Sequence, residues 1–189
     1  MHNKTVMICA AVAVAAGFLS LAIFVPGATL LGITATTTAD SLGPHGYVVV
    51  SAKHADGSEF YHEESHNLIT SAGKDFIAAQ IGSTSPGANG ANYIALTNTA
   101  ITPAAADTTL SGEITTNGLA RAQGTYAHTA GQNTFTVSKT FTATATQSAQ
   151  AAGLFTASSA GTMMAENTFT SVTLNNGDQL TLTWTITLS

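Results

Sequence analysis

The chain contains little cysteine and little charge. Its one cysteine, Cys9, lies in an apolar block near the N-terminus, so the rest of the chain can form no disulfide and has no thiol chemistry. Only 8% of the 189 residues are charged, and the 5 cationic residues are scattered along the chain. No basic stripe could neutralise several phosphates, which argues against a nucleic-acid partner. The composition therefore excludes a disulfide-stapled scaffold and a polycation, and packing and strand pairing must supply the stability.

The N-terminal block is the longest apolar run. No charged residue lies between Lys4 and Asp40, and the run from Val6 to Phe24 is almost continuously apolar. About 20 helical residues cross a bilayer core, so we interpret residues 1–27 as a hydrophobic helix that is either a signal peptide or an N-terminal transmembrane anchor. Cleavage could follow the small residues ending at Ala39. Both fates predict an exported domain, either membrane-anchored and extracellular or secreted, on a cell or in a virion.

A polar spacer, residues 28–45, leads into a single domain over residues 46–189. Gly46 to Lys53 and Ser58 to Glu64 flank an Asp-Gly turn and predict a β-hairpin. Ser71 is expected to cap a short helix that carries Asp75 in its first turn, an apolar face of Phe76, Ile77, Ala79 and Ile81, and an end at Gly82.

The remainder predicts short strands separated by turns. The clearest is the last, where Leu180, Leu182, Trp184, Ile186 and Leu188 alternate with threonines, so that one face is buried with Trp184 as a core anchor. This pattern favours a mainly β chain folded as an antiparallel β-sandwich or jelly-roll-like domain with one short helix. The other expected strands are Asn92 to Thr97, Gly118 to Thr129, Thr134 to Thr146, Ala151 to Ala157 and Met163 to Phe169.

The motif His62-Glu63-Glu64-Ser65-His66 matches the zinc-binding pattern His-Glu-x-x-His, in which two histidines one helical turn apart hold the metal. Here the pentapeptide continues the second strand of the predicted hairpin, and a strand separates positions i and i+4 by about 13 Å. A zinc hydrolase is therefore a remote alternative, and His62 and His66, with His54, are weak metal candidates. No cofactor is expected.

The threonine-rich strand faces have two interpretations. The ordinary one is a solvated face, and the sharper one is a flat hydroxyl array that binds a glycan or a crystalline surface. Charge-poor strands also invite self-association, for which donor-strand exchange through Gly46 to Lys53 is one route.

Eight short pieces of the chain, most of them in the second half, form a further pattern. They are Asn67 to Thr70, Gly73 to Ile77, Tyr93 to Leu96, Asp107 to Leu110, Glu113-Ile114, Gly118 to Arg121, Gly153 to Phe155 and Leu174 to Ser189. Together these pieces resemble β-rich structural modules of tailed-phage or archaeal-virus-like virion and surface proteins. The resemblance implies a virion, fibre or surface component and brings no catalytic motif, whereas the apolar N-terminus departs from a plain phage tail module.

Taken together, these features predict a non-enzymatic structural or adhesive protein that acts by assembly or attachment. Its expected partners are other copies of itself or other surface or virion proteins, and the membrane through Val6 to Phe24 if that segment is retained. The alternative is an extracellular carbohydrate- or ligand-binding module.

Overall fold

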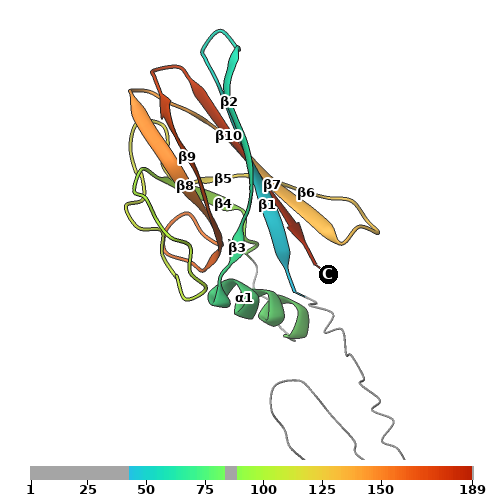
Figure 1. The fold of residues 1–189 in the computed structure, drawn as a ribbon. Coiled ribbons are helices and arrows are strands. Elements are labelled where there is room, and N and C mark those ends of the chain that lie inside the picture. Colours follow the sequence, from blue (N-terminus) through green and yellow to red (C-terminus); the bar gives the residue numbers. More distant parts are fainter. Residues whose placement is uncertain (1–42, 84–88, 189) are drawn as a thin grey trace, which may run out of the picture. The chain divides into compact units, whose positions relative to one another are not determined.

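The computed structural model describes residues 43–83 and 89–188, which form two five-stranded antiparallel sheets and one helix (Figure 1). The first sheet has the order β2-β1-β10-β7-β6 and the second has the order β3-β9-β8-β4-β5. This arrangement confirms the predicted mainly β domain with a short helix. The elements are β1 (His45–Lys53), β2 (Glu59–His66), β3 (Leu68–Ile69), α1 (Ser71–Gly82), β4 (Tyr93–Thr97), β5 (Ala122–Gln123), β6 (Thr125–His128), β7 (Thr134–Thr142), β8 (Gln147–Phe155), β9 (Met163–Leu174) and β10 (Gln179–Thr187).

The predicted N-terminal hydrophobic helix lies outside the described residues. Within the described part of the chain, no helix is long and apolar enough to cross a membrane.

Most predicted strands are present, with one correction. The hairpin and the last strand are confirmed, and β1 pairs with β10 along its whole length. The single strand expected from Gly118 to Thr129 is wrong, because Gly124 divides it into β5 in one sheet and β6 in the other. A Cβ on Gly124 would lie 2.8 Å from Cγ1 of Val137 and 2.9 Å from the Ser138 carbonyl oxygen, so the corner requires glycine.

The helix begins one residue earlier than expected. Thr70, not Ser71, is its N-cap, and the Thr70 hydroxyl accepts a hydrogen bond from the Gly73 N–H at 2.9 Å. Asp75 consequently falls beyond the first turn, which holds no acidic residue. Thr70 is fully buried and also donates to the Met163 carbonyl oxygen at 2.6 Å, so the cap joins α1 to β9.

The core lies between the inner faces of the two sheets. Trp184 is fully buried there, as predicted, with β1, β7 and β10 contributing alternate apolar residues. Burying a large side chain of this kind removes roughly 150–250 Å² from water. The alternation in the last strand is therefore the pattern that fixes the inner face of the first sheet.

The two sheets are connected along both sides. On one side the chain passes directly from β5 into β6. On the other side, side chains of β2 bond the backbone of β9: the Tyr61 hydroxyl lies 2.8 Å from the Thr170 carbonyl oxygen, and the Thr170 N–H donates to Glu63 Oε2 at 2.9 Å. The backbone N–H and carbonyl of Thr170, which lies beyond the residues of β9 that pair with β3, thereby have partners without a further strand.

Residues 98–121, here called the covering segment, contribute to both cores: Ile114 and Leu119 belong to the main core, and the part around Leu110 lies against the outer face of the second sheet. Leu110 from this segment forms a small second core with Ala95, Phe155 and Met163, while Ile101 packs against it. Those sheet residues alternate with the ones that face the main core, so the second sheet is buried on both faces. The first sheet has no such cover among the described residues, and its outer face is left open.

Candidate functional site

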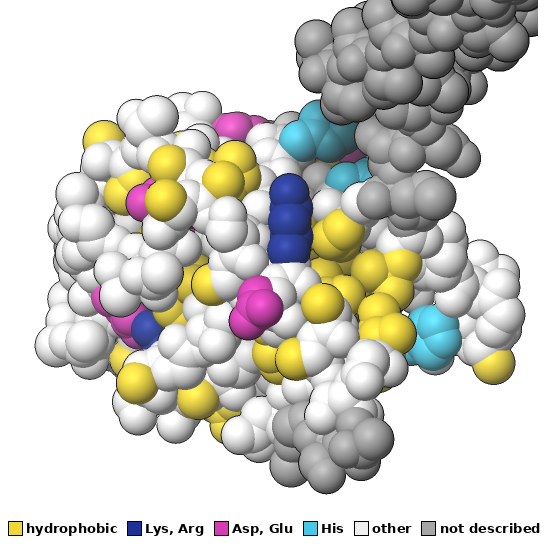
Figure 2. Space-filling view, turned by 90° about the horizontal axis from the view of Figure 1, so that it is seen from below, with side chains coloured by type: hydrophobic (Ala, Val, Ile, Leu, Met, Phe, Trp, Pro, Cys, Tyr) yellow, Lys and Arg dark blue, Asp and Glu magenta, His cyan; other side chains and the backbone are white. Residues whose placement is uncertain are grey.

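An apolar groove lies at the end of the domain that carries α1. It has a volume of about 490 Å³ and no charged residue lines it. Figure 2, which looks onto this end, shows hydrophobic side chains gathered there, with basic and acidic side chains beside them. The lining residues are Phe76, Ile77, Gln80, Ile81, Asn89, Gly90, Ala91, Asn92, Tyr126, Phe135, Met164 and Leu188.

The packing of α1 creates one wall of the groove. Gly73 is the helix's one buried residue, and a Cβ there would lie 2.1 Å from the Met164 carbonyl oxygen. This close approach pins the first turn to β9, and Phe76 and Ile77 pack against the core. Ile81, in the last turn, remains 75% exposed, so the expected continuous apolar face is only half buried. An isoleucine so exposed at the edge of an apolar hollow marks a surface suited to contact.

The opposite wall comes from the end of the first sheet. Tyr126 on β6 packs against Phe135 on β7 with ring centroids 5.6 Å apart, yet Tyr126 remains 56% exposed. Leu188 follows β10, held by hydrogen bonds between its backbone and Asn133, and is 40% exposed. Ile81, Tyr126 and Leu188, three large apolar side chains from separate parts of the fold, are therefore exposed to solvent around one groove.

The β6 strand beside this groove is an edge strand without charge. Its four residues, Thr125 to His128, are all exposed and pair with β7 on one side only. No described residue forms a backbone hydrogen bond with its other side, and the strand carries no lysine, glutamate, aspartate or proline. Natural sheet edges are usually blunted by charge, proline or a bulge. β6 has none of these features.

The other edge of the same sheet, β2, is blunted. It carries three glutamates and two histidines over eight residues. Glu63 accepts a 2.7 Å hydrogen bond from the Tyr61 hydroxyl. Although partial burial opposes the charge, this bond and the bonds from Thr170 lower the pKa of Glu63. Burial, followed by the contact with Glu63, raises the pKa of Tyr61. The β2 edge therefore carries exposed charged side chains, and its partly buried Tyr61 and Glu63 form hydrogen bonds with β9.

The zinc-like pentapeptide lies in β2, as predicted, and not on a helix. His62 and His66 are exposed, with His62 Nε2 3.5 Å from Glu64 Oε1 and Nδ1 3.8 Å from Glu59 Oε1. His54 is not in β2 and lies in the turn between β1 and β2. Across the part of the chain that the structure describes, no three histidine, cysteine or acidic residues lie together as metal ligands would.

His54 instead pairs with a nearly buried acid. Its Nδ1 is 3.2 Å from Asp178 Oδ1 and its ring stacks on Phe60 with centroids 4.2 Å apart. The N–H of Asn175, and then the contact with His54, lower the pKa of Asp178. This pair connects two turns of the first sheet, so His54 has a structural role there.

A second, smaller hollow lies on the first sheet. It has a volume of about 310 Å³ and is lined by Tyr47, Glu64, Ser65 and His66. Tyr47 is 42% exposed and stands on the same open face as the threonines of β7 and β10. An exposed aromatic ring beside hydroxyls and a carboxylate has the chemistry that sugars require.

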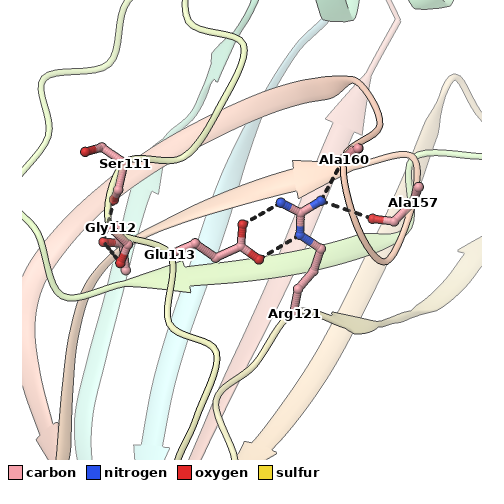
Figure 3. A network of polar contacts seen from close by, with 7 residues as sticks. Ser111, Gly112, Glu113, Arg121, Ala157 and Ala160 are labelled. Carbon is pink, nitrogen blue, oxygen red and sulfur yellow. Dashed lines mark hydrogen bonds and ion pairs between the residues drawn. The ribbon is translucent and has the colours of Figure 1, made fainter.

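The residues of the resemblance at Glu113 and Arg121 form a clamp (Figure 3). Arg121 donates to both carboxylate oxygens of Glu113, and to the carbonyl oxygens of Ala157 at 3.2 Å and Ala160 at 2.8 Å. Its guanidinium carbon lies 3.6 Å above the centre of the Phe155 ring. The clamp connects the covering segment to the turn between β8 and β9, so Glu113 and Arg121 stabilise the fold.

Sequence reasoning missed the groove. The residues that matter, Ile81, Tyr126 and Leu188, were assigned to helix or strand as ordinary apolar positions, and their exposure depends on how α1 meets the first sheet. The available signal was local: β6 is a charge-free strand next to a glycine corner, whereas β2 is crowded with charge. That contrast could have marked β6 as the open edge.

No family model, curated protein or solved structure matches the chain.

Proposed function

We propose that the chain is a non-enzymatic structural or adhesive protein of a cell surface or a virion, which acts by assembly or attachment. The observation that carries this proposal is the apolar groove beside the uncharged, unpaired edge of β6. Export through residues 1–27, jelly-roll-like connectivity and kinship with virion modules belong to the same proposal.

The contrast between the two edges of the first sheet supports assembly. An exposed strand edge next to an apolar hollow is an aggregation hazard unless another chain covers it. The β2 edge carries charges that oppose such pairing, while β6 carries none. A protein that remained a monomer would be expected to have both edges protected.

Immunogold electron microscopy of the native source tests the proposal, with antibody to residues 40–189. Label along filaments or on particles supports an assembly subunit, and an even cell-surface layer supports attachment. Label confined to the cell interior would contradict both.

A pair of full-length variants tests the groove itself. Ile81→Asp places a charge at the groove and should weaken self-association, measured by analytical ultracentrifugation in detergent. Ala78→Asp is the matched control, since Ala78 is an exposed α1 residue that does not line the groove. Equal association of both variants would exclude the groove.

A glycan-binding module is the second candidate, and the hollow around Tyr47 favours it. Aromatic rings and hydroxyls together bind the apolar face and the edge of a sugar. A glycan array with the full chain should show signals that Tyr47→Ala abolishes and that Tyr126→Ala leaves unchanged. A silent array would remove this candidate.

A further inference from the structure

We infer that β6 pairs with β6 of a second copy of the chain, antiparallel and about a two-fold axis perpendicular to the first sheet, so that two five-stranded sheets become one sheet of ten strands. The inference rests on the proposed assembly function and names the partner and the symmetry. Donor-strand exchange through Gly46 to Lys53 is not needed, because β1 is a central strand bonded to β2 and β10 in its own domain.

Among the strand edges that the structure describes, β6 is the one suited to its own copy. A two-fold axis brings identical edges together, so each charge on an edge meets the same charge on its partner. β2 carries three glutamates, and its Tyr61 and Glu63 already bond the backbone of β9. β3 and β5, the edges of the second sheet, have two residues each. β6 has four exposed residues, with no lysine, arginine or acid among them, and is paired on one side.

The pleat of β6 limits the register of this pairing. Tyr126 lies on the groove side of the sheet, since it pairs with the buried Val137 of β7, and Ala127 therefore lies on the outer face. A two-fold axis perpendicular to the sheet keeps each face on its own side, so residues pair only with residues of the same face. The two registers that pair most of β6 are centred on Tyr126 or on Ala127, and the central residue then faces its own copy.

The groove enlarges the contact between the two copies. A stable specific interface buries about 1,200 Å² or more in total, which exceeds what the pairing of four strand residues supplies. Ile81, Tyr126 and Leu188 are 75%, 56% and 40% exposed around the groove, so apolar area lies beside the strand. Paired strands lie about 4.8 Å apart, so Tyr126 of the second copy adds an aromatic ring near the rim of the groove. No charged residue lines the groove, and docking there desolvates no charge.

Disulfide trapping in the full chain tests the pairing, in a Cys9→Ser background. Tyr126→Cys and Ala127→Cys are made separately, because a residue at the axis faces its own copy with Cβ atoms about 5 Å apart, close enough for a disulfide. One of the two should give several-fold more covalent dimer than the control Glu64→Cys, an exposed position on the other edge of the same sheet. If neither variant exceeds the control, the inference is overturned.

A charge at the edge gives a second test, which needs no cysteine. Ala127→Lys places two lysines near the axis and should raise the Kd of the dimer at least tenfold, measured by sedimentation of the full chain in detergent. Thr140→Lys is the matched control, since Thr140 is exposed on the same face of the first sheet but lies outside the pairing of β6 with β7. Urea denaturation checks that both variants fold. Equal dimerisation of the two variants would contradict the inference.

The outcomes also separate this inference from the proposed function. A contact between two identical edges closes on itself and joins two copies only. If immunogold labels filaments, particles or the cell surface while neither test detects pairing at β6, this inference fails and the proposed function stands. If the full chain sediments as a monomer and label is confined to the cell interior, both fail.

Discussion

The outer faces of the two sheets differ although the sheets have the same number of strands. The face of the second sheet is buried beneath the covering segment, which brings its own small core and two carboxylate contacts, at Glu113 and Glu166. The face of the first sheet carries hydroxyl pairs such as Thr140 with Thr181. Stability should therefore depend strongly on contacts over the second sheet and weakly on those over the first, which leaves the first free for interaction.

The largest effect should come from Arg121→Ala. It leaves the partly buried Glu113 carboxylate without its cation and releases the covering segment from the β8–β9 turn. Removing one partner of a buried ion pair costs about 3–5 kcal/mol, measured here by urea denaturation.

Two controls define the cause. Arg121→Lys retains charge but not the two-pronged geometry and should lie between wild type and Arg121→Ala. Lys53→Ala removes an exposed cation at the end of β1 and should change stability by less than about 0.5 kcal/mol. Equal losses from Arg121→Ala and Lys53→Ala would contradict the proposed difference between the two faces.

Glu166→Gln should have the next largest effect, and one that depends on pH. Glu166 is 1% exposed and accepts a 2.8 Å hydrogen bond from the Ala104 N–H, which also lies 3.0 Å from Asp107 Oδ2. Burial chiefly, together with the neighbouring Asp107 and against the Ala104 bond, raises the pKa of Glu166 to about 7.

The direction of this pH dependence follows from proton binding. Between the ordinary pKa of 4.5 and the folded value of about 7, the folded state holds a proton that the unfolded chain releases, so stability falls as pH rises through this range. At pH 8, Glu166→Gln should be more stable than wild type by roughly 1–3 kcal/mol, and at pH 5 the two should be nearly equal. A constant difference between pH 5 and pH 8 would contradict the burial of an ionisable carboxylate under the covering segment.

The first sheet could largely be predicted from the sequence, and the cover of the second could not. Strict alternation around Trp184 and the Asp-Gly turn determine strands whose pairing partners are close in sequence or strongly patterned. In the covering segment, Leu110 is an isolated apolar residue among threonine, glycine and alanine. No period marks it, and its burial depends on a sheet face to which Ala95, earlier in the chain, and Phe155 and Met163, more than 40 positions later, contribute together.

The candidate site shows the same division. The strand assignment of His62 and His66 followed from the hairpin and is confirmed, which removes the helical spacing that the zinc motif needs. The groove required knowing where α1 docks, and that depends on a contact between Gly73 and the β9 backbone that no local pattern encodes. A site that is formed by tertiary packing leaves no periodic pattern in the sequence.

The smallest effect should come from the hydroxyl pair Thr140 and Thr181, whose oxygens are 2.8 Å apart on the open face. Water can replace each partner, so a double-mutant cycle of Thr140→Ala and Thr181→Ala should give a coupling of roughly 0.2–1 kcal/mol by urea denaturation. The unpaired combination of Thr140→Ala with Thr185→Ala is the control and should be additive. A coupling above about 2 kcal/mol would mean that the hydroxyls are shielded from water, and the first sheet would then have a cover of its own and could not serve as an interaction face.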